Sequence, residues 1–181
     1  MSESSGRLTA FNQSLLARQL ALVETQRFVG RYPHAWLVWT LGPSSVQRPS
    51  IDVSIADTKH PSGEAPPPGP PLVGDAICFA LKAAPGAVVR IGRALENDLV
   101  VSDLSVSRLH ARLELSAAGW TLATLPTAGT TRVREAALAP GSAVVLSPRD
   151  RLSLGDAHLV FYDAAAFCDW LRASPLSRAV S

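Results

Sequence analysis

A run of short apolar segments separated by turn-forming residues constrains the fold of this chain more than any other feature. From residue 72 onward, strand-like pieces recur about every 8 to 12 residues, with Gly, Pro, Ser and Asp between them. Short strands in this rhythm are typical of an antiparallel β-sandwich. The pieces are AICFALK, AVVRIG, DLVV, LHARLEL, GWTLATL, TTRVR, SAVVLS, DRLSL and AHLVFYD. We therefore predict a mainly β chain with one sandwich over residues 72–163.

Alternation within the pieces supports this prediction. Leu113 and Leu115 share one face of their segment, whereas Arg112 and Glu114 lie on the other. A period of two is expected of a strand with one buried and one solvated face.

Helical patterns flank the sandwich on both sides. Apolar residues spaced by three and four over residues 8–28 predict one amphipathic helix, ended by Gly30 and Pro33. It is either a docking or oligomerisation helix or a helix that packs on its own domain. At the other end, Asp163 as a cap and Pro175 as a stop predict a short C-terminal helix and tail over residues 164–181, covering one end of the sandwich.

The stretch between the first helix and the sandwich divides into two parts. Residues 35–39 read AWLVW and predict an extended segment, either an anchor strand or an exposed aromatic recognition patch; IDVSI at residues 51–55 predicts a second short strand. Residues 57–71 are rich in Pro and Gly and predict a linker, with a ligand for a proline-binding module as the alternative. The expected units are 1–56, 57–71, 72–163 and 164–181.

Composition excludes several classes of protein. Of 181 residues, 47% are hydrophobic and 18% charged, which is globular, and the net charge of +2 comes from scattered residues, so we expect no nucleic-acid partner. No apolar run approaches the length of a membrane span, and no secretion signal is evident, so we expect a cytoplasmic protein without membrane contact. The amphipathic, Ser-rich start leaves a transit peptide open. Cys78 and Cys168 are predicted to be buried free thiols in a reducing compartment.

The stretch from residue 91 to residue 113 carries the polar residues of a candidate site. It reads IGRALENDLVVSDLSVSRLHARL and resembles the forkhead-associated (FHA) domain through the pattern GR, ND and SRxHA at this spacing. The resemblance covers about residues 72–163. It implies a β-sandwich that recognises phosphothreonine peptides without catalysis. The implied partner is a threonine-phosphorylated protein, either a Ser/Thr protein kinase or its substrate.

The resemblance also implies roles for individual residues. Arg93 and Ser107 would hold the phosphate, with Arg108 as a second donor or a rim contact, which suits a ligand of charge about −1.5 to −2 with three acceptor oxygens. Ser105 occupies a position that can touch the peptide after the phosphothreonine. The residues expected at the phosphopeptide site are Arg93, Ser105, Ser107, Arg108, Ala128, Gly129 and Thr130, and those expected to support it are Gly92, Asn97 and His110.

One loop departs from the family pattern. The family usually carries an Asn-Gly pair that fixes the peptide backbone, but residues 126–131 read PTAGTT, which places Gly129 or Ala128 at the Asn position. Losing one neutral hydrogen bond to a ligand costs on the order of 1 kcal/mol, so weaker binding or altered selection is expected. The alternative is a phosphate-independent scaffold that docks partners through the sandwich, the N-terminal helix and the Trp36/Trp39 segment.

Catalytic readings lack support. A Ser107/His110 hydrolase dyad has no GxSxG elbow and no third orienting group, and the chain has no GxxxxGK[ST], HExxH or GxGxxG motif. We therefore expect no enzyme, no cofactor and no metal.

Overall fold

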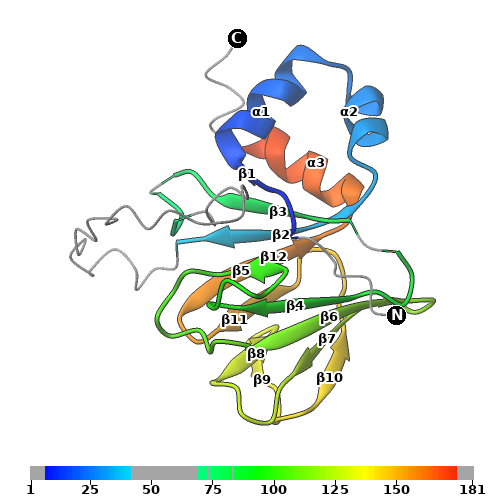
Figure 1. Cartoon of the computed structure of the whole chain (residues 1–181). Coiled ribbons are helices and arrows are strands. Elements are labelled where there is room, and N and C mark those ends of the chain that lie inside the picture. The colour runs from blue at the N-terminus through cyan, green and yellow to red at the C-terminus, as the bar shows by residue number, and fades with distance from the viewer. Residues whose placement is uncertain (1–6, 42–68, 73, 83, 175–181) are drawn as a thin grey trace.

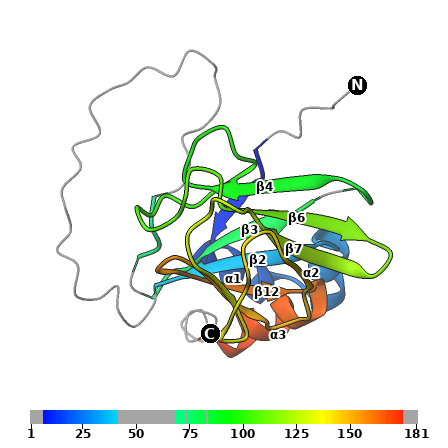
Figure 2. The same ribbon diagram turned by 90° about the horizontal axis from the view of Figure 1, so that it is seen from below.

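The computed structural model describes residues 7–41, 69–72, 74–82 and 84–174, which form two stacked β-sheets with helices on one outer face (Figure 1). The predicted strand at residues 51–55 and most of the predicted linker lie outside these residues. Viewed from below in Figure 2, strands β4, β6 and β7 form one layer and strands β2, β3 and β12 the other.

Each sheet mixes strands from distant parts of the chain. The first sheet runs β1 (Ala10–Asn12), β3 (Ile77–Leu81), β2 (Ala35–Thr40), β12 (Ala157–Tyr162), β11 (Arg151–Leu154), β8 (Thr131–Val133) and β9 (Ala136–Ala137). The second runs β10 (Ala143–Val145), β7 (Gly119–Thr124), β6 (Ala111–Ser116), β4 (Val88–Gly92) and β5 (Leu99–Val100). The pairings are antiparallel, except that β4 and β5 are parallel. The predicted antiparallel β-sandwich is confirmed.

The sandwich core consists of the inward-facing residues of both sheets. Leu113 on β6 is fully buried, and its neighbours Arg112 and Glu114 are exposed, as the alternation predicts. Phe79 on β3 and Ile91 on β4 contribute to the same core. Burial of a side chain of this size stabilises the fold by about 1.5–3 kcal/mol.

Strand β2 is a central strand of the first sheet and not part of an appendage. It pairs with β3 on one side and with β12 on the other. Leu37 and Trp39 face the sandwich core, whereas Trp36 and Val38 pack against the helices. Trp36 is 0% exposed and Trp39 3%, so the alternative of an exposed aromatic patch is wrong. A strand that is apolar on both faces must be covered on both faces, and here the second sheet and the helices cover it.

The predicted single N-terminal helix is also wrong in detail. The segment divides into β1, α1 (Gln13–Leu22) and α2 (Thr25–Arg31). Before α1, Phe11 pairs with Cys78 at the edge of the sheet, and Leu8 packs in the sandwich core. After α1, Val23 is extended, with φ −133° and ψ 156°. Strand pairing overrides the helical spacing at one end, since tertiary contacts outweigh weak local propensity.

The helices cover the outer face of the seven-stranded sheet. α3 (Ala164–Ala173) begins as predicted at Asp163, whose side chain accepts a hydrogen bond from the Ala166 N–H at 2.7 Å. Its Phe167 ring stacks on Trp36 with centroids 4.2 Å apart. The C-terminal helix is therefore confirmed, but it lies with α1 and α2 over the sheet and not at an end of the sandwich (Figure 1).

Candidate functional site

Three loops meet at one edge of the sandwich. They are the β4–β5 loop (residues 93–98), the β5–β6 loop (residues 101–110) and the β7–β8 loop (residues 125–130). The Arg93 N–H donates to the Ser107 carbonyl at 3.0 Å, which joins the first two loops. The Gly129 N–H donates to the Ser107 Oγ at 2.9 Å, which joins the third. The structure therefore brings the predicted site residues of all three loops together around Ser107.

The β4–β5 loop packs tightly against the β5–β6 loop. The Asn97 side-chain amide donates to the Ala94 carbonyl at 2.8 Å and to the Arg108 carbonyl at 2.6 Å, and the side chain is buried. A Cβ built on Gly92 would lie 2.2 Å from the Arg108 carbonyl oxygen. Glycine is required here because any side chain would separate the two loops.

His110 lies beneath the loops and is 0% exposed. Its Nδ1 accepts a hydrogen bond from the Ser107 N–H at 3.0 Å, so in the neutral ring the proton lies on Nε2, which donates to the Thr131 Oγ1 at 3.1 Å. Burial lowers the pKa of His110, and a hydrogen bond with the Thr130 backbone opposes this shift. The ring is therefore neutral near pH 7 and holds the β5–β6 loop against β8.

The Ser107 hydroxyl and two arginines carry the chemistry at the rim. The Ser107 Oγ accepts from the Gly129 N–H, and its proton has no acceptor within the described part of the chain. Arg93 and Arg108 are exposed, and neither forms an ion pair or a side-chain hydrogen bond with a residue that the structure describes. Such a set of donors suits an anion. Neither ring nitrogen of His110 bonds the Ser107 hydroxyl, so the geometry is not that of a hydrolase dyad.

Ser105 is engaged inside the protein. Its hydroxyl donates to the Asp103 Oδ1 at 2.6 Å and accepts from the Asp156 N–H at 2.8 Å. A Cβ on Gly155, which has φ +60°, would lie 2.4 Å from the Ser105 carbonyl oxygen. Ser105 therefore supports the turn between β11 and β12. Gly155, Asp156 and Asp103 take part in this support and were not predicted from the sequence. A Gly-Asp turn between two strands is common, so Gly155 and Asp156 carry only a weak signal in the sequence.

The β7–β8 loop forms the far wall of the candidate site. Ala128 is half-buried, and Gly129 and Thr130 are exposed. The Ala128 N–H donates to the Leu125 carbonyl at 3.1 Å, and the Gly155 N–H donates to the Thr130 carbonyl at 2.9 Å. A Cβ on Gly129 would make ordinary contacts at 3.6 Å. The loop is held from both sides, yet it offers no side-chain amide to a ligand.

The two cysteines of the chain have surroundings typical of structural residues. Cys78 and Cys168 are free and buried, as predicted, and burial raises the pKa of both thiols.

Within residues 7–41, 69–72, 74–82 and 84–174, no group of His, Cys, Asp and Glu could hold a metal ion. No helix in these ranges has the length and apolar character needed to span a membrane.

Sequence comparisons identify relatives of the sandwich. A family model described as the cytoplasmic domain of an inner membrane component of the T3SS matches residues 79–165. An FHA domain-containing protein of Arabidopsis thaliana is 30% identical over 87 residues, which is 48% of this chain and 22% of that protein.

Solved structures to which the chain is similar include FHA domains. Mycobacterium tuberculosis EmbR, in complex with a low-affinity phosphopeptide, is 28% identical over 48% of this chain and 21% of that chain, with a TM-score of 0.43. The FHA domain of a hypothetical protein of Arabidopsis thaliana is 22% identical over 72% of this chain and 86% of that chain, with a TM-score of 0.47. The chain spans about a fifth of the length of the curated relative and of EmbR.

Proposed function

Because the chain carries a forkhead-associated (FHA) domain, we propose that its three loops bind a phosphothreonine peptide. The partner is a protein phosphorylated by a Ser/Thr kinase, or such a kinase itself, and the chain acts as a non-catalytic cytoplasmic adaptor in that signalling. The observation that carries the proposal is the cluster at the rim. The Ser107 hydroxyl proton has no acceptor among the described residues, Arg108 follows Ser107 in the chain, and the Arg93 N–H bonds the Ser107 carbonyl. Both arginines are exposed and have no acidic partner among the described residues.

Each rim residue has a distinct task in this proposal. The forked guanidinium of Arg93 pairs with two phosphate oxygens, and the compact hydroxyl of Ser107 donates to a third. Arg108 adds a donor at the edge. Arg93 has no carboxylate partner among the described residues that a phosphate would have to displace. The free energy of binding is therefore more favourable.

The walls of the site position the peptide. His110 holds Ser107 through the backbone, so the Ser107 hydroxyl remains directed by the Gly129 N–H and not by a base. Residues 128–130 line the side where the peptide backbone passes. Ser105 has both hydroxyl functions occupied, so we assign it to support of the loop and not to peptide contact.

Arg93→Ala tests the proposal. The loss of charge-assisted bonds to the phosphate is expected to weaken binding by about 2–3 kcal/mol, roughly 30- to 150-fold. A phosphothreonine peptide library screened on an array and titrated by fluorescence anisotropy measures it. The matched control is Arg18→Ala, since Arg18 is exposed on α1 over the opposite sheet.

Two outcomes would contradict the proposal. One is the absence of phosphothreonine-dependent binding across the library. The other is binding that does not change in Arg93→Ala while the unphosphorylated peptides bind equally well.

A second candidate function is phosphate-independent docking. The absence of the family's Asn at position 129, where this chain has Gly, favours it. So does the match to a family model described as the cytoplasmic domain of an inner membrane component of the T3SS, a description that names no phosphopeptide. Trp36 and Trp39 cannot be the docking residues, because they are buried. The exposed apolar residues Leu15 and Leu22 on α1 are the better candidates.

Phosphatase treatment of a captured complex separates the two functions. Deleting residues 1–56 would not test docking through the N-terminal helices alone, because the deletion also removes the central strand β2. Leu15→Lys with Leu22→Lys leaves the core intact. Docking is supported if the complex survives dephosphorylation and dissociates in this double variant.

A further inference from the structure

The helices cover only part of the outer face of the seven-stranded sheet. The buried cluster beneath them takes its strand residues from β1, β2, β3 and β12, through side chains such as Trp36, Cys78 and Tyr162. Figure 1 shows α1, α2 and α3 over that part of the sheet and away from β8 and β9. Within the described part of the chain, the outer faces of β8, β9 and β11 therefore have no covering layer.

Two arginines lie close together on this uncovered surface. Arg132 on β8 pairs with Ser153 on β11, and Arg151 is two residues before Ser153, so the three side chains share one face. Val160 pairs with Arg151 and packs against the helical layer, which identifies this face as the outer one. Diagonal neighbours such as Arg132 and Arg151 are about 7–8 Å apart. Both are exposed, and neither forms an ion pair or a side-chain hydrogen bond with a described residue.

A third arginine reaches the same surface from a strained turn. Arg149 has φ 73°, and its N–H donates to the Phe161 carbonyl, whereas the Phe161 N–H donates to the Asp150 carbonyl. Two residues thus oppose one, which makes a β-bulge whose first residue is left-handed, a position where glycine is usual. The Arg149 guanidinium lies 3.9 Å from the Asp169 carboxylate on α3, so the bulge directs this side chain toward the helical side of the sheet.

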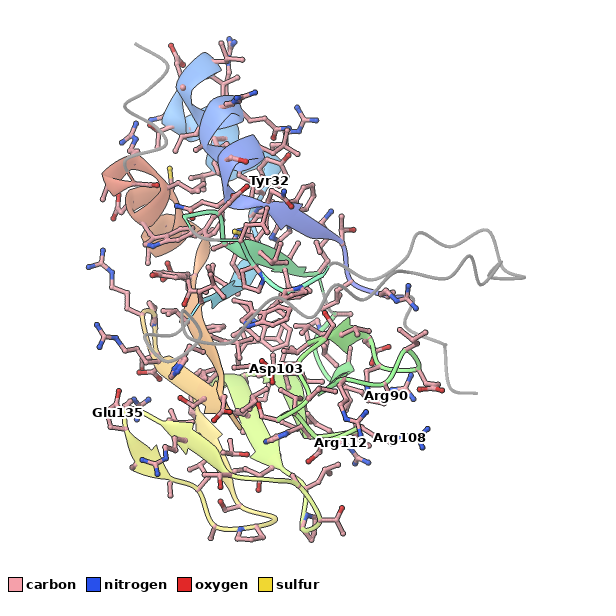
Figure 3. The ribbon with its side chains drawn as sticks, turned by 90° about the vertical axis from the view of Figure 1, so that its left-hand side faces the viewer. Tyr32, Arg90, Asp103, Arg108, Arg112 and Glu135 are labelled. Atoms are coloured by element: carbon pink, nitrogen blue, oxygen red, sulfur yellow. The ribbon has the colours of Figure 1, made fainter. Side chains whose placement is uncertain are left out.

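Arg132, Arg149 and Arg151 together form what we term the β11 basic face. Burial raises the pKa of Tyr162, and the charges of Arg149 and Arg151 oppose this shift, so both guanidinium groups lie near the same phenol. The face lies away from the phosphate loops. Figure 3 shows Glu135, on the turn after β8, on the opposite side of the molecule from the labelled arginines of β4, β6 and the β5–β6 loop.

Acidic side chains neutralise the β11 basic face incompletely. The Arg149–Asp169 pair is long, and its side chains are 66% and 67% exposed, so it contributes little to stability. The buried Asp150 carboxylate is already bound by Arg134 at 2.6 Å. Glu135 is exposed and forms no ion pair with a described residue. Two arginines without an acidic partner and a third with a weak one suit an anionic partner.

The surroundings of the arginines distinguish between classes of anionic partner. A basic surface that binds membranes also inserts apolar side chains, but the exposed large hydrophobic residues of the described part lie on elements other than β8, β11 and β12. Nucleic-acid binding draws on more phosphate contacts than three arginines provide. An extended peptide places alternate side chains on one side about 7 Å apart, which matches the separation of Arg132 and Arg151.

We propose that the β11 basic face docks an extended segment of a partner protein that carries Asp or Glu at alternating positions. Arginine pairs with a carboxylate through two parallel hydrogen bonds. Because the face lies away from the phosphate loops, an acidic partner leaves the phosphothreonine site open. The chain then joins an acidic partner to a phosphoprotein.

Two unphosphorylated peptides test the proposal. One has Glu alternating with Ser, and in the other Gln replaces each Glu. Fluorescence anisotropy is expected to show that the Glu peptide binds about tenfold more tightly than the Gln peptide, with a smaller difference at high salt. Arg151→Glu is expected to remove this difference. The matched control is Arg112→Glu, which is expected to retain it, since Arg112 is also exposed on a strand but lies opposite Arg90 on the other sheet.

Arg149→Gly separates binding from folding. Glycine relieves the strain at positive φ, so the Tm is expected to rise by a few degrees while the affinity for the Glu peptide falls several-fold. Glu135→Gly is the matched control, because Glu135 also has a positive φ of 69°. It is expected to raise the Tm without weakening the Glu peptide, since an acidic side chain is removed. A purely structural role of Arg149 would leave the affinity unchanged.

Equal affinities of the wild-type chain for the Glu and Gln peptides would overturn the proposal. An advantage of the Glu peptide that persists in Arg151→Glu, or that is lost in Arg112→Glu, would overturn it as well. Vesicles of phosphatidylcholine with phosphatidylserine and a single-stranded oligonucleotide are titrated in parallel. Binding of either one that depends on Arg151, without binding of the Glu peptide, would overturn the assignment of an acidic peptide. The Arg93→Ala titration tests the phosphothreonine site separately, so either proposal can fail without the other.

Discussion

Gly92→Ala is the sharpest test of how the site is built. The new methyl group would lie 2.2 Å from the Arg108 carbonyl oxygen, 2.8 Å from the carbonyl carbon and 2.8 Å from the Asn97 Nδ2. Real Cβ contacts to backbone oxygen are more than 3 Å, so the two loops must separate by about 1 Å. The Arg108 carbonyl is backbone, and the Asn97 side-chain amide is held by hydrogen bonds to the Ala94 and Arg108 carbonyls, so neither group can easily move away.

The magnitude follows from the bonds that this separation breaks. The Arg108 carbonyl accepts from the Asn97 side chain at 2.6 Å and from the Ala94 N–H at 3.1 Å. Net loss of two hydrogen bonds costs about 1 kcal/mol each, and overpacking adds about 1–3 kcal/mol. We expect a loss of about 3–5 kcal/mol in the free energy of unfolding, together with loss of phosphopeptide binding.

Urea unfolding followed by tryptophan fluorescence measures the change. Gly30→Ala is the matched control, since Gly30 lies in α2 with no atom within 4 Å of a built Cβ. Alanine in a helix is favoured over glycine, so this variant is expected to gain about 0.5–1 kcal/mol. The same chemical change is therefore predicted to act with opposite sign at the two sites.

A Gly92→Ala variant that loses less than about 1 kcal/mol and binds peptide normally would refute the reasoning. It would mean that the β4–β5 and β5–β6 loops do not require close contact.

Three further predictions concern individual positions. Gly129→Asn is expected to raise phosphopeptide affinity several-fold, about 1 kcal/mol, because the Cβ fits at 3.6 Å from the Ser107 Oγ and the amide supplies the absent bond; titration showing no gain would contradict this account of the loop. Glu135→Gly is expected to raise the free energy of unfolding by about 1 kcal/mol, since Glu135 has φ 69° on the hairpin between β8 and β9 (Figure 3), and calorimetry showing a lower Tm would refute it. Burial acts to raise the pKa of Asp150, but hydrogen bonds from Arg134 and the Ser147 N–H lower it overall. The Asp150 carboxylate therefore contributes its full stabilisation above its ordinary pKa of about 4, and this contribution is lost as the pH falls through the lowered value. In Asp150→Asn, the free energy of unfolding should decrease less steeply as the pH is lowered through this range.

The strand rhythm made the sandwich predictable, because a period of two reports local geometry that the sequence alone carries. The loop motif was recognisable through the family resemblance, which implied that Gly92 and Asn97 support the site. The structure gives the physical reason, since both residues lie in close contact with the Arg108 carbonyl. The C-terminal helix was also predictable, since its cap at Asp163 is a local interaction.

The position of the first forty residues was not predictable. The spacing of apolar residues before Gln13 fits a helix as well as it fits β1, and local propensity is too weak to choose between them. AWLVW is apolar on both faces, which indicates that both are covered, but it does not show which elements cover them. The neighbours of β2 in the sheet, β3 and β12, lie more than thirty residues away in the sequence. The engaged state of the Ser105 hydroxyl depends likewise on the turn at Asp156.

The sequence by itself determined the class of fold, because periodicity and caps are local properties of the chain, and its resemblance to a family indicated the residues of the candidate site. Only the tertiary structure decided which sheet β2 joins, which hydroxyls remain available and which arginines share a face. Those depend on contacts between segments distant in sequence, such as Ser105 with Asp156 and Arg90 with Arg112. Long-range pairing is set by the packing of the whole domain and leaves no local signature.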